Sequence, residues 1–384
     1  MTTPPRDPIR FHVAHLPPKA ASYVQEALEA NENVNGSFTR RVAEHLEATA
    51  GIHRVLVTHS ATAALEMAAM VLSSVHGAHQ VFMPAYTFTS TANAFLRAGY
   101  GLEFMDVDPA TMNVGMEAVL ATGAPANAVV APIHYAGNPG RIDEIVAWAK
   151  ERGVWVVEDA AQALGVRLGG TSAGGFGQLG AVSFHFTKNV HSMMGGALYV
   201  NDPALVETAT YIWERGTNRQ AMLKGLVDKY SWVDLGSSFQ TTELQAALLL
   251  AGLEDHDQVI THRRQLWQVY AERLGGLADR GVFTQEWRPD AENNFHAFFV
   301  RLESASMADD LRETLAARGV HAYIGYIALH TSPYGIAHGF ARPLPATDRW
   351  SECILRLPLH TAMSGEDVHR VVDEIEDWVS RRSG

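Results

Sequence analysis

Residues 154–159 read Val-Trp-Val-Val-Glu-Asp, a short hydrophobic run that ends in two carboxylates. A strand without polar residues on either face is typical of a parallel sheet that helices cover on both sides. Such sheets bind ligands at the carboxyl ends of their strands, which is where Glu158 and Asp159 stand. Asp is also a common helix N-cap, so Asp159 taken alone indicates a binding site and a capping role equally well.

Similar hydrophobic runs alternate with helix-forming stretches from about residue 20 to residue 260. The expected strands are 55–57, 81–83, 128–133 and 154–157, and the expected helices are 62–72, 91–97 and 143–150. After about residue 256 the order changes to helices at 262–274, 307–318 and 365–382 with strands at 296–302 and 321–327. We therefore predict an α/β fold: a large domain with a mainly parallel sheet over residues 1–255, including an N-terminal segment, and a smaller α+β domain over residues 256–384.

Composition narrows the class of protein. The 384 residues carry a net charge of −12 and are 47% hydrophobic, which excludes a disordered chain and argues against a protein that binds nucleic acid through its phosphates. Cys353 is the only cysteine, so neither an intrachain disulfide nor a Cys-based zinc site is possible. No apolar run approaches the ~20 residues that span a bilayer. Among the 18 histidines, His76 and His79 are three apart and His185 and His191 six apart, but there is no H-E-x-x-H motif and no acidic residue at zincin spacing, so we predict no metal site. The single cysteine and the lack of long apolar runs predict a cytoplasmic protein without membrane segments.

The segment Gly175-Phe176-Gly177-Gln178-Leu179-Gly180 matches the dinucleotide-binding pattern G-x-G-x-x-G. That pattern binds a pyrophosphate only where it follows a strand and opens a helix. Here it leads into residues 181–186, which alternate like a strand. We therefore predict a glycine turn before a strand, and a nicotinamide-dependent dehydrogenase loses its main support.

Lysine is rare in this chain, with five residues: Lys19, Lys150, Lys188, Lys224 and Lys229. Lys188 follows the predicted strand at residues 182–186, and an amine that is buried beside a strand has a lowered pKa and becomes nucleophilic. A nucleophilic lysine and an acid at another strand end are the pair that pyridoxal 5′-phosphate (PLP) needs. The lysine bonds to the PLP aldehyde, and the carboxylate keeps the ring nitrogen protonated.

PLP also carries a phosphate, and residues 58–64 offer a place for it. They read Thr-His-Ser-Ala-Thr-Ala-Ala between a predicted strand and a predicted helix. Backbone N–H groups at a helix N-terminus bind anions. Ordinary Ser/Thr capping gives the same geometry without a ligand, so the phosphate site depends on its agreement with Lys188 and Asp159.

Four separated blocks together resemble the DegT/DnrJ/EryC1/StrS family of sugar aminotransferases. They are residues 84–88 (Pro-Ala-Tyr-Thr-Phe), 106–109 (Asp-Val-Asp-Pro), 158–162 (Glu-Asp-Ala-Ala-Gln) and 183–189 (Ser-Phe-His-Phe-Thr-Lys-Asn). The resemblance extends from about Gly36 to the last predicted helix. It implies the PLP-dependent transferase fold of type I, like aspartate aminotransferase, in a homodimer with shared active sites. It also implies that L-glutamate donates an amino group to a nucleotide-linked keto-sugar, with pyridoxamine 5′-phosphate as the intermediate form of the cofactor.

The resemblance assigns roles to single residues. Lys188 becomes the lysine that bonds to PLP, and Asp159 becomes the partner of the ring nitrogen. The other implied cofactor contacts are Phe88 on the ring face, Gln162 beside the ring hydroxyl, and Ala61, Thr62 and Ser183 at the phosphate. Ser238 stands where many relatives contribute an asparagine from the partner subunit. Relatives with histidine in place of the lysine are dehydratases, so Lys188 favours transamination.

Residues 215–219, 228–232 and 235–238 further resemble the branch of dTDP-4-amino-4,6-dideoxygalactose transaminases, which serve surface polysaccharide or lipopolysaccharide biosynthesis. The candidate substrate-binding residues are Tyr86, His185, Arg215, Asn218, Lys229, Tyr230, Tyr326 and His330. Two departures stand out: Ala328 replaces the usual proline of a Y-x-P-L-H segment, and residues 191–194 (His-Ser-Met-Met) replace small residues and a glutamate.

Three functions follow for testing. The first is amino transfer to C4 of dTDP-4-keto-6-deoxyglucose, which gives dTDP-4-amino-4,6-dideoxygalactose. The second is a nucleotide-sugar aminotransferase that acts at C3 or gives another configuration at C4. The third belongs to a different class, a non-catalytic PLP-binding regulator, which would need a DNA-binding module or a basic patch that the sequence lacks.

Overall fold

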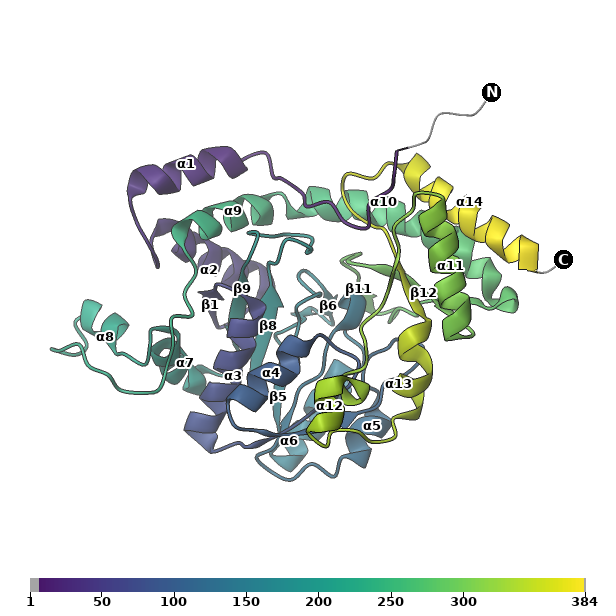
Figure 1. The fold of residues 1–384 in the computed structure, drawn as a ribbon. Coiled ribbons are helices and arrows are strands. Elements are labelled where there is room, and N and C mark those ends of the chain that lie inside the picture. Colours follow the sequence, from purple (N-terminus) through teal and green to yellow (C-terminus); the bar gives the residue numbers. More distant parts are fainter. Residues whose placement is uncertain (1–6, 383–384) are drawn as a thin grey trace.

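The computed structural model describes residues 7–382 and has a seven-stranded sheet at its centre (Figure 1). In spatial order the strands are β1 (Arg54–Thr58), β9 (Gly196–Val200), β8 (Leu179–Ser183), β5 (Trp155–Asp159), β4 (Val129–Val130), β2 (Gln80–Pro84) and β3 (Gly101–Met105). Neighbours from β8 to β3 are parallel, whereas β9 is antiparallel to both β8 and β1. The predicted α/β fold with a mainly parallel sheet is confirmed.

Helices cover both faces of this sheet because side chains alternate along each strand. Leu56 packs in one hydrophobic cluster with the residues of α3, whereas Val55 and Val57 pack in another with those of α2 and α9. The helices of this part are α2 (Ser37–Ala50), α3 (Ala61–His76), α4 (Thr89–Arg97), α5 (Met116–Ala121), α6 (Ile142–Arg152), α7 (Val206–Trp213) and α9 (Glu243–Glu254).

A smaller antiparallel sheet follows in the C-terminal part of the chain. Its order is β10 (Val282–Thr284), β12 (Phe298–Leu302), β14 (Ile354–Leu357) and β13 (Tyr323–Ile324). Residues of three long helices build its core, and two short helices complete this part: α10 (His256–Leu274), α11 (Ala305–Ala317), α14 (Gly365–Arg382), α12 (Pro333–Ala337) and α13 (Pro345–Trp350). The strands predicted at 296–302 and 321–327 thus form over shorter lengths. The predicted domain boundary lies next to the junction between α9 and α10.

The N-terminal segment packs first against the C-terminal part of the chain and then along α9. Ile9 pairs in parallel with Val320, and the ring of Phe11 packs edge-on against Tyr323 at 4.7 Å. The chain then reaches α1 (Ala20–Ala30), which lies along α9 and is held there by an ion pair of 2.7 Å between Lys19 and Glu254 (Figure 1). Residues 9–12 therefore lie against the C-terminal part of the chain.

The glycine-rich segment at residues 175–180 forms a turn that enters β8, as predicted. The backbone N–H groups of Phe176 and Gly177 in this turn, and of Gly174 just before it, donate to the buried carboxylate of Glu158 at 2.7, 2.7 and 2.8 Å. A Cβ at position 177 would lie 2.5 Å from the carbonyl oxygen of Val156, so the turn requires glycine there. It also connects to a small sheet of β11 (Ala291–Glu292), β6 (Arg167–Leu168) and β7 (Thr171–Ser172).

The strand predicted at residues 182–186 is shifted, because β8 ends at Ser183. The backbone N–H groups of Phe184 and Phe186 instead bond to the carbonyl oxygens of Gly195 and Met193, so the alternating pattern continues into a loop. This loop carries Lys188.

Residues 214–238 form a projecting arm that contains the short helix α8 (Arg219–Leu223) (Figure 1). The arm exposes large apolar side chains, with Leu226 at 74% and Trp232 at 77% exposure. Among residues 7–382, none of the helices combines the length and hydrophobicity that crossing a membrane requires.

Candidate active site

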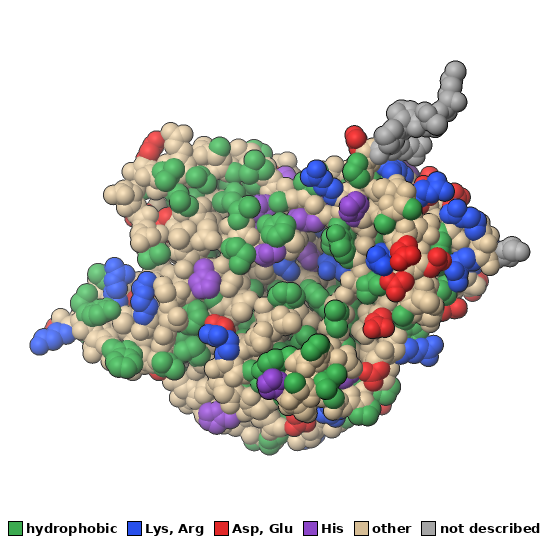
Figure 2. Space-filling model, in the orientation of Figure 1, with side chains coloured by type: hydrophobic (Ala, Val, Ile, Leu, Met, Phe, Trp, Pro, Cys, Tyr) green, Lys and Arg blue, Asp and Glu red, His purple; other side chains and the backbone are tan. Residues whose placement is uncertain are grey.

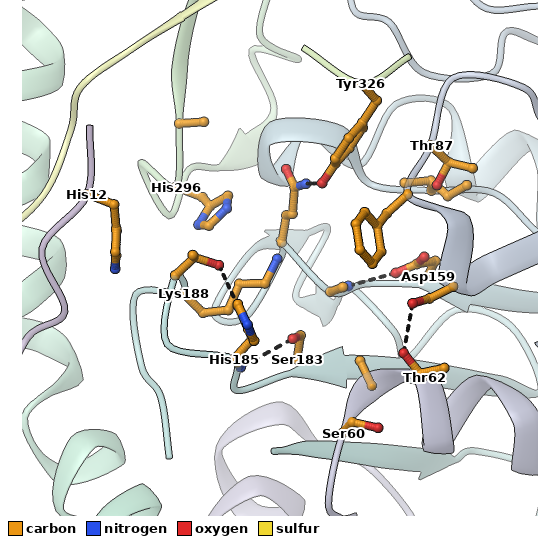
Figure 3. Close-up of a pocket in the computed structure, with 18 of the residues that line it drawn as sticks. His12, Ser60, Thr62, Thr87, Asp159, Ser183, His185, Lys188, His296 and Tyr326 are labelled. Atoms are coloured by element: carbon orange, nitrogen blue, oxygen red, sulfur yellow. Dashed lines mark hydrogen bonds between the residues drawn. The ribbon is translucent and has the colours of Figure 1, made fainter. Parts of the chain in front are cut away.

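A cavity of about 490 Å³ lies between the carboxyl ends of the large-sheet strands and the small sheet. Residues at the ends of β1, β5 and β8 or just after them form one wall, and residues of β14 and those just before β12 form the opposite wall. Figure 2 shows histidine side chains gathered around a hollow in this face of the molecule. Four further residues that line the cavity are His12, Thr87, His185 and His296 (Figure 3).

Lys188 extends from the loop after β8 into this cavity (Figure 3). Burial lowers the pKa of its amine to about 8, while the nearby charge of Asp159 raises it and that of Arg356 lowers it further. The backbone N–H of Lys188 donates to the carbonyl oxygen of His185 at 2.9 Å, which makes a tight turn. With this pKa about a tenth of the amine is uncharged at pH 7, far more than for an exposed lysine, and the uncharged form is nucleophilic.

Asp159 is the last residue of β5 and is 6% exposed. The hydroxyl of Thr91 donates to its Oδ2 at 2.6 Å, and the backbone N–H of Ala161 donates to its Oδ1 at 3.1 Å. Within residues 7–382 no basic side chain forms an ion pair with this carboxylate. No helix directly follows β5 in the described chain, so the contact with Ala161 closes a turn and Asp159 is not a helix cap.

The turn between β1 and α3 lies beside Asp159 along the same cavity wall. The hydroxyl of Ser60 accepts the N–H of Ala63 at 3.1 Å and caps α3. Ala61 and Thr62 occupy the first helical turn, where backbone N–H groups have no partner inside the helix, and both line the cavity. The hydroxyl of Thr62 donates to Ser90 at 2.8 Å, and Ser183 at the end of β8 lines the same region.

Gln162 and Tyr326 connect the two walls. The amide Nε2 of Gln162 donates to the hydroxyl of Tyr326 at 2.8 Å, and its Oε1 accepts the N–H of Ala136 at 2.7 Å. Burial raises the pKa of Tyr326 to about 12, so its hydroxyl stays protonated. The rings of Phe88 and Tyr86 each lie 6.0 Å from that of Tyr326, but only Phe88 lines the cavity.

Several predicted substrate residues and one predicted cofactor residue, Ser238, lie elsewhere. Ser238 accepts a hydrogen bond from the guanidinium of Arg215 at 3.1 Å, and both belong to the arm. Three more residues also lie on the arm and do not line the cavity: Asn218, Lys229 and Tyr230. His330 is buried and pairs with Asp348 at 2.7 Å, away from the cavity lining. Within one subunit, the structure thus brings together the cofactor residues other than Ser238, and His185 and Tyr326 among the substrate residues.

Sequence reasoning missed residues on the wall opposite Lys188. Arg356 of β14, His296 just before β12, and Phe11 and His12 of the N-terminal segment all line the cavity. Arg356 could have been noticed in the sequence, because it is the single charged residue in the strand Ile354–Leu357. Thr91, which contacts Asp159, was harder to single out, because it is one of several hydroxyl residues at the start of α4.

The cavity fits PLP by the chemistry of its donors. Lys188 and Asp159 face one space without forming an ion pair, which leaves room for a flat ring between them (Figure 3). An unpaired buried carboxylate suits a protonated ring nitrogen, and the first turn of α3 suits a phosphate. Asp159 and the turn at Ala61 and Thr62 would hold the cofactor, and Lys188 would bond to its aldehyde.

This fold and this lysine and aspartate pair define a PLP-dependent transferase of fold type I. Residues 16–376 match the DegT/DnrJ/EryC1/StrS aminotransferase family, so the chain belongs to that family and is an aminotransferase.

The chain is similar to dTDP-4-dehydro-2,3,6-trideoxy-D-glucose 4-aminotransferase of Saccharopolyspora spinosa, with 28% identity over 90% of each protein. Among solved structures it is similar to the aminotransferase TlmJ from Streptoalloteichus hindustanus, with 26% identity, a TM-score of 0.88, and coverage of 98% of this chain and 100% of the other. It is also similar to DesI, solved in the presence of its TDP-sugar product, with 28% identity, a TM-score of 0.85, and coverage of 98% and 94%.

Proposed function

We propose that this enzyme transfers an amino group from L-glutamate to C4 of dTDP-4-keto-6-deoxyglucose and gives dTDP-4-amino-4,6-dideoxygalactose. The observation that carries the aminotransferase chemistry is the buried Lys188 amine, which faces Asp159 across one cavity. The relative from Saccharopolyspora spinosa is named as a 4-aminotransferase of a dTDP-sugar, and DesI has a TDP-sugar product. The names of these two relatives support a dTDP-linked substrate, and the first also supports amination at C4. The galacto configuration depends on the arm sequences at residues 215–238.

The residues around the cavity have different roles in such a reaction. PLP, when bound, supplies the carbonyl that accepts the amino group and a ring that withdraws electrons. The amine of Lys188 removes the proton from Cα of glutamate and returns a proton to the sugar carbon, for which a pKa near 8 is suitable. The negative charge of Asp159 holds a proton on the ring nitrogen, and Thr91 fixes the carboxylate with its 2.6 Å hydrogen bond.

We further propose a homodimer in which the arm completes the active site of the partner subunit. The exposed Leu226 and Trp232 support burial of the arm against another chain. The predicted substrate residues of the arm and Ser238 lie away from this subunit's cavity. In the dimer, Arg215, Asn218, Lys229 and Tyr230 would reach the partner's substrate, and Ser238 would reach the partner's cofactor. We also propose, from the sequence, that the chain divides into two domains between residues 255 and 256 and that the enzyme is cytoplasmic. Sedimentation of the purified enzyme tests the dimer, and an active monomer would contradict it.

The test of function is incubation with PLP, glutamate and a panel of dTDP- and UDP-linked keto-sugars, followed by NMR of the product. The expected product carries an axial amino group at C4. Amination at C3, or an equatorial C4 amine, would support the second function. Absence of both 2-oxoglutarate and amino-sugar would favour the non-catalytic regulator.

Lys188→Ala provides the matching genetic test. Loss of the general base is expected to lower the rate by about 10²–10⁴-fold or more. Lys150→Ala is the control, because Lys150 is exposed at the end of α6. A Lys188→Ala enzyme with the wild-type rate would rule out the proposed role of this lysine.

A further inference from the structure

His12 and His296 are two cavity histidines in which hydrogen bonds decide which ring nitrogen carries the proton. Nε2 of His12 lies 2.7 Å from the carbonyl oxygen of Phe186. Since a carbonyl oxygen can only accept a hydrogen bond, this Nε2 is protonated. Nδ1 of His296 lies 3.2 Å from Oδ1 of Asn189, and that amide is oriented by its own donation to the carbonyl oxygen of Asn294 at 2.8 Å. In His296 the protonated nitrogen is therefore Nδ1.

Both rings are uncharged at pH 7. Burial lowers the pKa of His12 to about 4 and that of His296 well below its usual range. A neutral imidazole has a free lone pair on its unprotonated nitrogen, which is Nδ1 in His12 and Nε2 in His296. Among residues 7–382, neither of these two atoms has a hydrogen-bond partner, and both side chains line the cavity. The cavity thus has two hydrogen-bond acceptors that the fold does not use.

These acceptors border the part of the cavity that the cofactor ring leaves free. In Figure 3 the side chain of Lys188 extends from the side of His12 and His296 toward Asp159. The ring of PLP would occupy the space between the Lys188 amine and Asp159. The charge of Lys188 lowers the pKa of His296, so this histidine lies near the amine that handles the proton. The space at the two histidines is therefore available to the substrate.

We propose that His12 and His296 accept hydrogen bonds from the hydroxyl groups on C2 and C3 of the keto-sugar. A carboxylate or a diphosphate offers only acceptors, so it cannot pair with two unprotonated nitrogens. The charged groups that act on His296 are lysine and arginine side chains, and their positive charge disfavours an ammonium group at this place. A hydroxyl is a neutral donor and fits both conditions. This role rests on the proposed function and adds the residues that select the sugar.

The hydroxyls on C2 and C3 distinguish the proposed substrate from a more deoxygenated sugar. The substrate dTDP-4-keto-6-deoxyglucose has both, and C3 is next to the carbon that receives the amine. The 2,3,6-trideoxy sugar in the name of the relative from Saccharopolyspora spinosa has neither. A site that pairs with a hydroxyl rejects the analogue that lacks it, because its polar groups are then left without a partner. The two histidines would therefore favour the hydroxylated sugar.

The experiment measures binding of two unreactive sugar nucleotides to the PLP-loaded enzyme by calorimetry. The first, dTDP-6-deoxyglucose, has both hydroxyls, and the second, dTDP-2,3,6-trideoxyglucose, lacks them. Neither has a keto group, so binding is read without catalysis. His12→Phe and His296→Phe each keep a ring and remove an acceptor. His12→Gln offers an amide that can both donate to Phe186 and accept from a hydroxyl.

His360→Phe is the matched control. The ring of His360 lies 6.4 Å from that of His12, and its Nε2 donates to the carbonyl oxygen of Arg10 at 3.0 Å. Its side chain does not line the cavity. The control therefore disturbs the same N-terminal segment as His12→Phe without removing an acceptor from the substrate's space.

The wild type should bind dTDP-6-deoxyglucose roughly tenfold or more tightly than the trideoxy sugar, the range for one or two hydrogen bonds. His12→Phe and His296→Phe should each reduce this ratio about threefold to tenfold by weakening the hydroxylated sugar alone. His12→Gln should retain most of the ratio, and His360→Phe all of it. A purely structural role would weaken both sugars equally. Equal affinities in the wild type, or an unchanged ratio in both phenylalanine variants, would overturn the proposal.

Product analysis separates the role of the histidines from the proposed function. If the enzyme aminates C4 but binds the two unreactive sugars equally, the role of His12 and His296 fails alone. If no sugar is aminated at C4 while the ratio is present and falls in His12→Phe, the C4 assignment fails and the role of the histidines stands.

Discussion

Glu158 and Asp159 are neighbouring carboxylates at the end of one strand, and they face two different regions of the molecule. Glu158 is fully buried behind the sheet, where three backbone N–H groups of the glycine turn and Nε2 of His134 surround it at 2.7–2.8 Å. Asp159 faces the cavity with two hydrogen-bond donors and no cation. Successive side chains of a strand point to opposite sides, so one residue of register decides which acid meets the ligand.

The difference teaches that burial and acidity alone do not identify a catalytic carboxylate. The more buried acid of the two has the richer hydrogen bonding, and its lone pairs are occupied by the fold itself. Asp159 accepts fewer hydrogen bonds from the protein, so its carboxylate is the one that remains available to a cofactor. Substitutions that remove one charge at a time should therefore separate chemistry from stability.

Asp159→Asn should give the largest change in activity and little change in stability. An asparagine oxygen can accept the N–H of Ala161 and its amide can donate to the Thr91 hydroxyl, which then acts as the acceptor, but the side chain cannot hold a proton on the ring nitrogen by its charge. We expect the rate of amino transfer to fall by about a hundredfold or more. Steady-state assays and thermal denaturation of the cofactor-free protein measure the two effects. A variant that unfolds early yet turns over normally would reverse the comparison.

Glu158→Gln should do the opposite. An amide would place N–H donors against the backbone N–H groups of the glycine turn and leave buried groups unsatisfied. Breaking such a buried network costs about 2–4 kcal/mol, which chemical denaturation of the cofactor-free protein can measure. The folded fraction should retain most of its activity per molecule. Wild-type stability would show that the glycine turn does not depend on this charge.

Thr91→Val should have a smaller effect on the cavity side. The variant keeps the shape of the side chain and loses the 2.6 Å hydrogen bond to Asp159. Loss of one hydrogen bond to a charged group predicts a roughly tenfold lower rate. Thr87→Val serves for comparison, because the Thr87 hydroxyl lies 3.4 Å from that of Thr91 and reaches Asp159 only through it. Equal effects of the two variants would argue against a direct role for Thr91.

The wall that carries Asp159 was predictable because its residues end or follow strands of one sheet. Hydrophobic runs mark those strands, and the carboxyl ends of parallel strands meet at one edge, so Lys188, Asp159 and the turn at Ala61 and Thr62 could be placed together. The structure indeed places them around one cavity. The glycine turn was predictable too. Its hydrogen bonds to Glu158 were not, because the sequence does not show how the turn is aligned with the end of β5.

The opposite wall could not be predicted, for reasons of topology. Arg356 and Phe11 lie at opposite ends of the chain and meet through the pairing of Ile9 with Val320. Such long-range contacts leave no periodic signal near either residue. His330 was expected near the substrate, yet its ring is buried in contact with Asp348, which local sequence does not reveal.

The pH dependence of the Lys188 amine gives the smallest and sharpest test of the comparison. In the cofactor-free wild type, acylation of this lysine should rise with pH about a midpoint near 8, because burial favours the uncharged amine. Asp159 lies on the same cavity and its charge raises the pKa of Lys188, so Asp159→Asn should lower the midpoint. Glu158→Gln, whose charge lies behind the sheet, should leave it unchanged. Mass spectrometry of the modified peptide measures all three, and an equal shift in both variants would show that the two carboxylates act on the cavity alike.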